Sequence, residues 1–280
     1  MIGLIIQARV GSTRLPNKIM ADLGGKPVIE HVIQRCAAAK LPELVVIAMP
    51  KEDFIDHGHS QKTAGERVRK IAAKYRAEVY APPDTDTDDV LGRFFKTAIH
   101  YHMNQIVRIT SDCPLLDPGI IDRCLHEFMV NRNQIEYVTN TIQRVHPRGM
   151  DVEVMSFNAL EKAFLDGSVG DQRGFDQEHV TPYVRRNPRI FPHKDLGVNP
   201  MAEGMDLRLT LDYPEDLELL RAVHKACTAE VHNAGMPDAI LKQNPHITGQ
   251  YPMFGVCEIK KAYEKNPTWI NINGMHRQAG

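Results

Sequence analysis

The sequence predicts an α/β fold in which helices cover both faces of a mostly parallel sheet. Over the first half of the chain, short apolar runs alternate with segments of helical periodicity. Repeated βα units of this kind build parallel sheets with right-handed connections. With 280 residues and a net charge of −1, the chain is long enough to bury a core without metals or disulfides.

Each expected element of the first half rests on a local pattern. Short apolar runs predict strands, and apolar residues that recur every three or four positions predict helices. Asp117 is expected to cap a helix that begins at Pro118, because proline is well tolerated in a first helical turn. The expected order is strand 4–6, helix 28–37, strand 44–47, helix 68–75, strand 79–80, helix 90–101, strand 106–109 and a helix from 118.

The pattern changes after residue 135. Val152 and Val154 alternate with polar residues, which predicts a half-exposed strand. A strand at 207–211 is expected to re-enter the sheet, followed by a helix that Pro214 opens. The remaining expected helices span 156–167 and 176–187, with short ones at 240–241 and 259–263. This organisation predicts a main domain over 1–230, with an inserted segment at about 135–205 and a C-terminal appendage at 231–280.

The composition argues against several classes of protein. Basic and acidic residues are balanced and no basic run occurs, which disfavours a nucleic-acid or membrane-surface partner. The five cysteines are widely spaced and form no Cys-x-x-Cys pair, so a reduced compartment is expected and a zinc site is not. No apolar run has the length of a signal peptide core or a membrane span, and a cytoplasmic protein is therefore expected.

The loop after the first strand has the composition of an anion site. Gly11 and Ser12 are small, and Arg9, Arg14 and Lys18 lie close to them in sequence. Small residues let backbone N–H groups approach an anion, and the cations add charge-assisted bonds to phosphate oxygens. A strand, a loop and a helix in this order bind phosphates in α/β folds. We therefore predict a phosphorylated ligand, with a nucleotide favoured, although the loop matches neither the P-loop nor the dinucleotide pattern.

Two carboxylates are expected at the same edge of the sheet. Asp112 follows the strand at 106–109, and Asp212 follows the strand expected at 207–211. Ligands bind at the carboxyl ends of the strands in open α/β sheets, and Mg²⁺ takes one or two carboxylates together with phosphate oxygens. The structural alternatives are a turn aspartate before Pro114 and a helix N-cap at Asp212. The pairing of two strand-end carboxylates favours a Mg²⁺–nucleotide site.

The segment 6–18 resembles the opening of the spore-coat polysaccharide type of cytidylyltransferases, which are relatives of CMP-sialate and CMP-Kdo synthetases. Further matching motifs follow in family order at 88–94, 108–116, 149–154, 178–183 and 208–212. The resemblance covers about residues 3–225. It implies a Rossmann-like nucleotidyltransferase fold, a glycosyltransferase-A-like three-layer sandwich, with CTP as the donor and Mg²⁺ as the cofactor.

The resemblance also implies roles for individual residues. The catalytic set is Arg14, Lys18, Asp112 and Asp212, of which the two aspartates are also the metal ligands. The nucleotide-binding set is Gln7, Ala8, Arg9, Gly11, Ser12, Asp88, Asp89 and Thr110. The acceptor-binding set is Gly149, Asp151, Glu153, Glu178 and His179. Arg93 is expected to brace a loop, and a structural role is favoured for His179 because an isolated helical histidine is more often structural than catalytic.

The function expected from this resemblance is transfer of CMP from CTP to a sugar acid or related acceptor, with release of pyrophosphate, for surface-glycan biosynthesis. The expected partners are CTP and a small-molecule acceptor, without nucleic acid or membrane, in a homodimer. One alternative is another nucleoside triphosphate, or a phosphorylated or phosphonate alcohol as acceptor. A second is a nucleotide-binding homologue without catalysis, which is supported by the C-terminal tail and by two departures from the family pattern, Ser111 for glycine and Gln177 for arginine.

Overall fold

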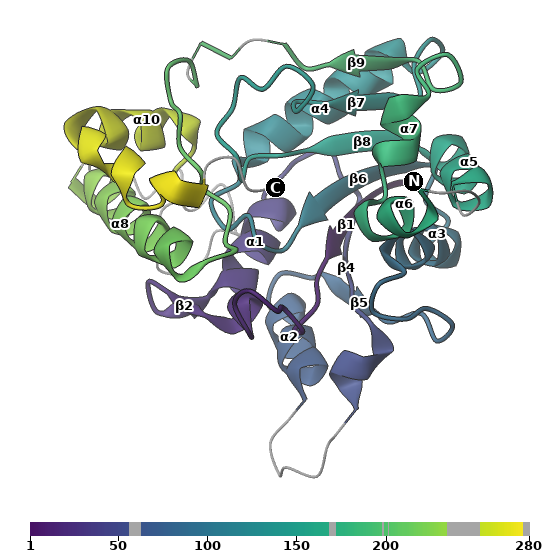
Figure 1. The fold of residues 1–280 in the computed structure, drawn as a ribbon, viewed down its shortest axis with the longest axis horizontal. Helices are drawn as coiled ribbons and strands as arrows, with labels where there is room; N and C mark the ends of the chain where they lie inside the picture. Colours follow the sequence, from purple (N-terminus) through teal and green to yellow (C-terminus); the bar gives the residue numbers. More distant parts are fainter. Residues whose placement is uncertain (56–62, 168–171, 198, 201, 234–252, 277–280) are drawn as a thin grey trace.

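The computed structural model describes residues 1–55, 63–167, 172–197, 199–200, 202–233 and 253–276. Within these residues, a seven-stranded sheet crosses the molecule in the order β5-β4-β1-β6-β8-β7-β9 (Figure 1). All neighbours are parallel except β8, which runs antiparallel to both β6 and β7. The strands are β1 (Ile2–Gln7), β4 (Leu44–Ala48), β5 (Glu78–Tyr80), β6 (Gln105–Thr110), β7 (Tyr137–Thr139), β8 (Glu153–Ser156) and β9 (His193–Asp195). The predicted mostly parallel sheet is confirmed.

Helices cover both faces of this sheet, as Figure 1 shows. The alternation of side chains along β1 explains the two layers, because Leu4 and Ile6 enter one apolar core and Ile5 enters the other. The first core is filled from α1 (Val28–Ala37), α2 (Ala64–Ala73), α4 (Pro118–Asn131), α8 (Pro214–Asn233) and α10 (Val256–Lys265). The second is filled mainly from α3 (Val90–His100), α5 (Phe157–Asp166) and α7 (Pro182–Arg186).

Short elements complete the architecture. A two-stranded ribbon of β2 (Asp22–Leu23) and β3 (Lys26–Pro27) precedes α1, and α6 (Arg173–His179) precedes α7. Single 3₁₀ turns occur at Lys18–Met20, Lys51–Phe54, Pro267–Asn271 and Gly274–His276. The predicted N-cap of α4 is confirmed, since Asp117 Oδ1 accepts a hydrogen bond from the Gly119 amide at 2.8 Å.

The prediction of a half-exposed strand at 152–155 is wrong. The strand β8 lies between β6 and β7, and helices cover both of its faces. Val154 enters the first core and Met155 the second, while Glu153 is only 4% exposed. The alternation of apolar and acidic residues therefore marks a buried carboxylate with partners of its own rather than a solvent-facing edge.

The predicted strand at 207–211 is also wrong. This segment forms only an isolated bridge, in which Arg208 pairs with Arg148 in parallel. Its partner cannot extend a ladder, because Pro147 lacks an N–H and Gly149 adopts a φ of 96°. The segment nevertheless reaches the carboxyl end of β6, where the Leu211 amide donates to the Asp112 carbonyl at 2.9 Å.

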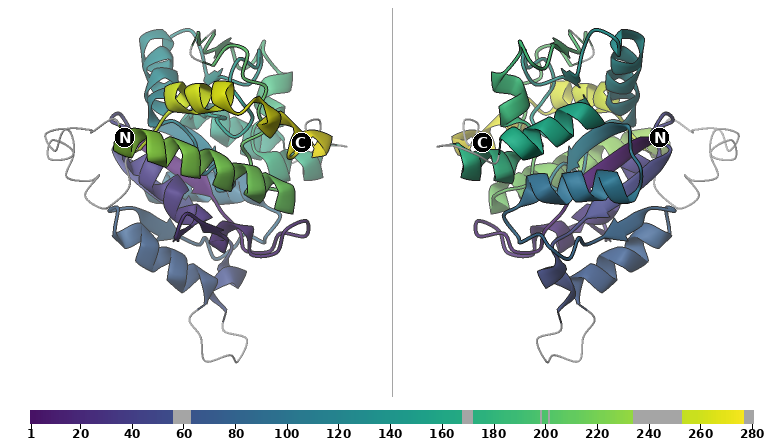
Figure 2. Two further views of the ribbon diagram at one scale, coloured as in Figure 1. Left: turned by 90° about the vertical axis from the view of Figure 1, so that its left-hand side faces the viewer. Right: turned by 90° about the vertical axis from the view of Figure 1, so that its right-hand side faces the viewer.

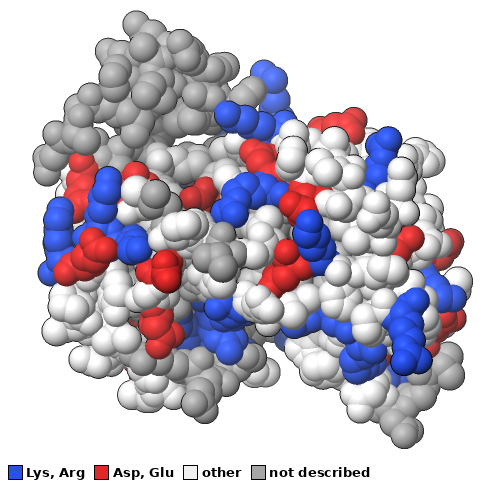
Figure 3. Space-filling view, turned by 90° about the horizontal axis from the view of Figure 1, so that it is seen from above, with Lys and Arg blue, Asp and Glu red and all other residues white. Residues whose placement is uncertain are grey.

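The C-terminal segment 253–276 packs back onto the rest of the chain. Figure 2 shows α10 beside α8, in agreement with their contacts. Helix α10 confirms the helix predicted at 259–263, whereas the one predicted at 240–241 lies outside the described residues. Seen from above, positive and negative side chains are interspersed over the surface (Figure 3). No helix among the described residues has the length and apolar character required to cross a bilayer.

Candidate active site

A cavity of about 430 Å³ lies beyond the carboxyl ends of β1 and β6. Parallel strands end at the same edge, so residues from distant parts of the chain meet here. Its lining includes two cations of the N-terminal loop, Arg14 and Lys18, facing both predicted carboxylates. The complete lining is Gln7, Ala8, Arg9, Ser12, Thr13, Arg14, Lys18, Val90, Arg93, Arg108, Thr110, Ser111, Asp112, Glu178, His179 and Asp212.

The ammonium group of Lys18 joins the two carboxylates. Its Nζ donates to Asp112 Oδ2 at 3.0 Å, to Asp212 Oδ1 at 2.9 Å and to the Leu211 carbonyl at 2.8 Å. Burial alone would lower the pKa of Lys18, but the two carboxylates outweigh it and the pKa is raised. Burial conversely opposes ionisation of Asp112, yet Lys18 lowers the pKa of this carboxyl. The two predicted strand-end carboxylates therefore meet at one point, with Lys18 between them.

A second layer of charges holds Asp212 from behind. Arg208 Nη2 donates to Asp212 Oδ2 at 2.6 Å, and its Nε donates to Asp216 Oδ1 at 3.3 Å. Asp216 is fully buried, and its Oδ2 accepts from the amides of Asp212 and Tyr213 at 2.9 and 3.0 Å. Arg14 completes the set with a 3.0 Å contact from Nη2 to Asp212 Oδ1. The orientation of Asp212 is thus fixed by contacts to its side chain and its backbone.

The predicted nucleotide-binding residues divide into two groups. Gln7, Ala8, Arg9, Ser12 and Thr110 line the cavity, whereas Gly11, Asp88 and Asp89 do not. Gly11 is exposed, and a Cβ atom there would have no neighbour within 4 Å. Asp89 is the N-cap of α3, where it accepts from the Gly92 amide at 2.9 Å.

Arg9 links the loop before α3 to the end of α6. Its Nη1 contacts Asp88 Oδ1 at 3.1 Å, and its Nη2 contacts Glu178 Oε1 at 3.4 Å. Asp88 belongs to the loop before α3, which Arg93 braces by donating from Nη1 to the Asp86 and Thr87 carbonyls. The bracing role predicted for Arg93 is confirmed, and its side chain also reaches the cavity.

The predicted acceptor-binding residues are not all brought together. Glu178 and His179 line the cavity, whereas Gly149, Asp151 and Glu153 do not. Asp151 forms a bidentate pair with Arg144, with distances of 2.7 and 3.0 Å. Gly149 instead allows the backbone of Leu209 to pack closely against it, because a Cβ atom at this position would lie 2.3 Å from the Leu209 carbonyl oxygen.

Glu153 is a buried brace beneath the cavity. Its carboxylate pairs with Arg108 Nη1 and accepts hydrogen bonds from the hydroxyls of Tyr137 and Thr181. Arg108 in turn donates from Nε to Gln7 Oε1 at 3.1 Å, and both of these side chains line the cavity. Burial opposes the charge on Glu153, but Arg108 lowers the pKa of this carboxyl. The ion pair therefore keeps Arg108 and Gln7 in position.

A strained turn follows His179. Val180 has a φ of 69° and a ψ of −55°, and the Thr181 amide donates to the His179 carbonyl at 2.8 Å. This is a γ-turn, which is rare for a β-branched residue and costs free energy. The surrounding packing maintains it, since Val180 is fully buried and the Thr181 hydroxyl bonds Glu153. The turn fixes the end of α6, which carries Glu178 and His179.

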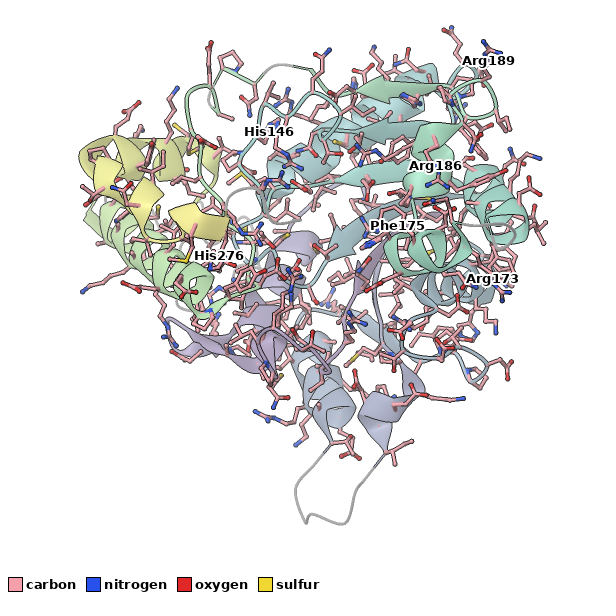
Figure 4. All side chains as sticks on the ribbon, viewed as in Figure 1. His146, Arg173, Phe175, Arg186, Arg189 and His276 are labelled. Carbon is pink, nitrogen blue, oxygen red and sulfur yellow. The ribbon has the colours of Figure 1, made fainter. Side chains whose placement is uncertain are left out.

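His179 is in contact with the cavity rather than remote from it. Its ring packs against Phe175 with centroids 4.4 Å apart, and Figure 4 labels Phe175 on α6. Burial lowers the pKa of His179, so the ring is neutral at pH 7. A neutral imidazole at the cavity wall can accept a proton, although the sequence favoured a structural role.

Sequence reasoning missed Arg108 and Tyr213 as site residues. Arg108 opens the matching motif at 108–116 without a role assigned to it, and its position near the carboxyl end of a predicted strand was the further signal for a ligand-facing residue. Tyr213 OH accepts from Arg14 Nη1 at 3.4 Å, and the guanidinium carbon lies 5.3 Å from the centre of the tyrosine ring. Its position directly after Asp212 was the available signal.

The donor set suits a hard cation. The described residues contain no group of three or more His, Cys, Asp or Glu side chains arranged around one ion, as zinc would need. Asp112, Asp212 and the Leu211 carbonyl instead offer oxygens, which already surround the positive charge of Lys18. Mg²⁺ binds such oxygens and completes its shell with phosphate and water, so the arrangement fits this ion.

Comparison with known proteins agrees with the resemblance. A family model described as cytidylyltransferase matches residues 4–244. The spore coat polysaccharide biosynthesis protein SpsF of Bacillus subtilis is 29% identical over 242 residues, which cover 86% of this chain and 94% of that protein. A 3-deoxy-manno-octulosonate cytidylyltransferase from Brucella ovis is 37% identical over 125 residues, or 43% of each chain. A cytidylyltransferase structure from Leptospira borgpetersenii serovar Hardjo-bovis superposes with a TM-score of 0.74 at 28% identity and covers 96% of both chains.

Proposed function

Because the chain belongs to the cytidylyltransferase family, we propose that it transfers CMP from CTP to a sugar acid or related acceptor and releases pyrophosphate. The observation that carries the proposal is the meeting of Arg14 and Lys18 with Asp112 and Asp212 in one cavity. A phosphate chain needs cations, and a magnesium ion needs carboxylates; this cavity offers both within bonding distance of each other.

Asp112 and Asp212 are the proposed ligands of Mg²⁺. When bound, the ion would neutralise charge on the phosphate oxygens and lower the pKa of the attacking hydroxyl. Lys18 holds the two carboxylates at a common point, as the three short contacts of Nζ indicate. With the ion bound, the ammonium group of Lys18 would pair with phosphate oxygens of the nucleotide.

The reaction is an in-line displacement at the α-phosphorus of CTP. A bond forms between an acceptor oxygen and this phosphorus, the bond to the bridging oxygen breaks, and pyrophosphate leaves with the electron pair. Arg9, Arg14 and Lys18 stabilise the charge on the departing phosphates, which is the main way proteins accelerate this chemistry. We assign the proton of the acceptor hydroxyl to His179, whose ring lines the cavity.

The acceptor is assigned to the wall formed by α6. Glu178 and His179 face the cavity there, opposite the loop that carries Arg9. The names of two relatives support an acidic sugar used for a surface glycan, since one acts on 3-deoxy-manno-octulosonate and the other belongs to spore coat polysaccharide biosynthesis. Surface-glycan biosynthesis is therefore the proposed context.

Two measurements and one variant test the proposal. Thermal unfolding with CTP, UTP, GTP or ATP in the presence of Mg²⁺ should show the largest increase in Tm with CTP, and equal shifts would contradict cytidine specificity. Pyrophosphate release should then require CTP and one member of a panel of sugar acids. Asp112→Asn should abolish this turnover while the circular dichroism spectrum stays unchanged, and near-normal kcat in that variant would remove Asp112 from the site.

A further inference from the structure

The C-terminal segment 253–276 lies outside the residues that the family model matches, yet it contacts residues that support Asp212 and Arg14. Its helix α10 attaches it to the core through apolar side chains, among them the fully buried Ile259. Trp269, in the following 3₁₀ turn, is 8% exposed and packs into the same core. This attachment brings the last described residues alongside the segment that carries Asp212.

Asn273 connects this segment to the charge network of Asp212. Its side chain is 2% exposed, and Nδ2 donates to Asp216 Oδ1 at 2.7 Å and to the Arg208 carbonyl at 3.0 Å. Both N–H bonds of the amide are therefore used within the network. Because Asp216 Oδ2 accepts from the Asp212 amide, Asn273 is two contacts away from the proposed metal ligand.

His276 makes a second connection, on the phosphate side of the site. Its ring stacks on Tyr213 with centroids 3.8 Å apart and an angle of 8° between the planes. The side chain of Tyr213 also contacts Arg14, through its hydroxyl and through its ring. Figure 4 labels His276 in this last turn, near α8. The stack therefore restricts the side chain of Tyr213, which contacts Arg14.

We propose that the turns at 267–276 are a positioning element of the active site, in which Asn273 sets Asp212 through Asp216 and His276 sets Arg14 through Tyr213. The proposal rests on the proposed function. A segment that only stabilised the fold would need no more than the apolar contacts of α10 and Trp269. A buried amide group needs hydrogen-bond acceptors for its N–H groups. Asn273 finds one of them on Asp216, the residue that orients Asp212.

The first test compares Asn273→Leu with Ile259→Val. Leucine has a similar volume but no donor, whereas the valine weakens the attachment of α10 without touching the charge network. Both variants should lower Tm. Only Asn273→Leu should raise the Mg²⁺ concentration that gives half-maximal turnover, by about tenfold, as expected for the loss of a hydrogen bond to a charged group. A change below twofold, with the same loss of Tm as in Ile259→Val, would overturn the proposal.

A double-mutant cycle separates this proposal from the proposed function, because it needs neither CTP nor turnover. Unfolding by urea is measured for the wild type, Asn273→Leu, Asp212→Asn and the double variant. If Asn273 acts on Asp212, the change in the unfolding constant of the double variant should differ from the product of the changes in the two single variants by about threefold or more. A simple product would refute the connection even if the enzyme used CTP. Conversely, a strong deviation in a protein that binds no CTP would leave the connection intact and remove the proposed function.

A pair of substitutions at His276 tests the second connection. His276→Phe keeps a flat ring on Tyr213, and His276→Ala removes it. We expect His276→Ala to weaken binding of CTP, measured by calorimetry without acceptor, by about fivefold, and His276→Phe to restore it to within twofold of the wild type. Equal affinities in the two variants would show that the stack does not position Arg14.

Discussion

Lys18, Asp112 and Asp212 form an ion triad. Replacing Lys18 by methionine should show how much this ion triad contributes to the free energy of unfolding. The side chains of Lys18, Asp112 and Asp212 are 14%, 23% and 10% exposed, so the substitution leaves two largely buried carboxylates without their shared cation. Breaking a buried ion pair costs about 3 to 5 kcal/mol. Asp212 retains Arg14 and Arg208, which places the expected loss at the lower end, about 3 kcal/mol, or about 5 °C in Tm for a chain of 280 residues.

The same variant should respond more strongly to Mg²⁺ than the wild type. With Lys18 gone, a divalent cation no longer competes with the ammonium group for the carboxylates, and ligands that bind only the folded state raise Tm. Differential scanning calorimetry with and without 10 mM MgCl₂, on the order of typical assay concentrations, measures both effects. Lys162→Met is the matched control, because the side chains of Lys162 and its partner Asp166 are 45% and 43% exposed, and such a surface pair should contribute less than about 1 kcal/mol. An unchanged Tm in Lys18→Met, or an equal response of both variants to Mg²⁺, would refute the reasoning.

Three further predictions follow from buried groups. Burial lowers the pKa of His31 to about 3, from 6.5 in the unfolded chain, so its contribution is fully present above pH 6.5 and is lost as the pH falls. By pH 5 this loss should reach about 2 kcal/mol, and urea titrations should show a flatter pH profile for His31→Gln. Glu153→Gln should cost about 3 kcal/mol by leaving Arg108 without its carboxylate, as a lower midpoint of urea unfolding would show. Gly149→Ala should cost about 3 kcal/mol or more in thermal unfolding, because its Cβ meets the Leu209 carbonyl at a φ of 96°; a Tm within 2 °C of the wild type, about 1 kcal/mol, would contradict this reading of the contact.

The sequence predicted the βα units of the first half well, because their signals are local. Apolar runs and helical periodicity depend on neighbouring residues, and the Asp117–Pro118 pair marks a helix start by itself. The meeting of Asp112 with the cationic loop was predictable for a different reason. It follows from a rule about where parallel strands end, and β1 and β6 are adjacent and parallel.

The errors arose where tertiary contacts override a local pattern. Residues 207–211 have the composition of a strand, but Pro147 and Gly149 in the facing segment limit pairing to one bridge. Glu153 has the alternation of a surface position, yet Arg108 on the neighbouring strand makes its burial possible. The segment that faces 207–211 and the partner of Glu153 are both distant in sequence. A short stretch of sequence therefore cannot predict either contact.

The contacts of Asn273 and His276 were out of reach for the same reason. Their side chains meet residues about 60 positions earlier, and no motif links the two regions. The charges themselves were visible in the sequence, but only the packing of α10 on α8 determines which of them the last turns contact.

The ion triad has a consequence for how the chain resists proteolysis. Its members come from residues 18, 112 and 212, and Asn273 adds a fourth region, so a nucleotide held there would tie together pieces from nearly the whole length of the polypeptide. Opening any one of them would release the ligand, and bound nucleotide should therefore slow proteolytic cleavage throughout the described chain rather than only beside the cavity.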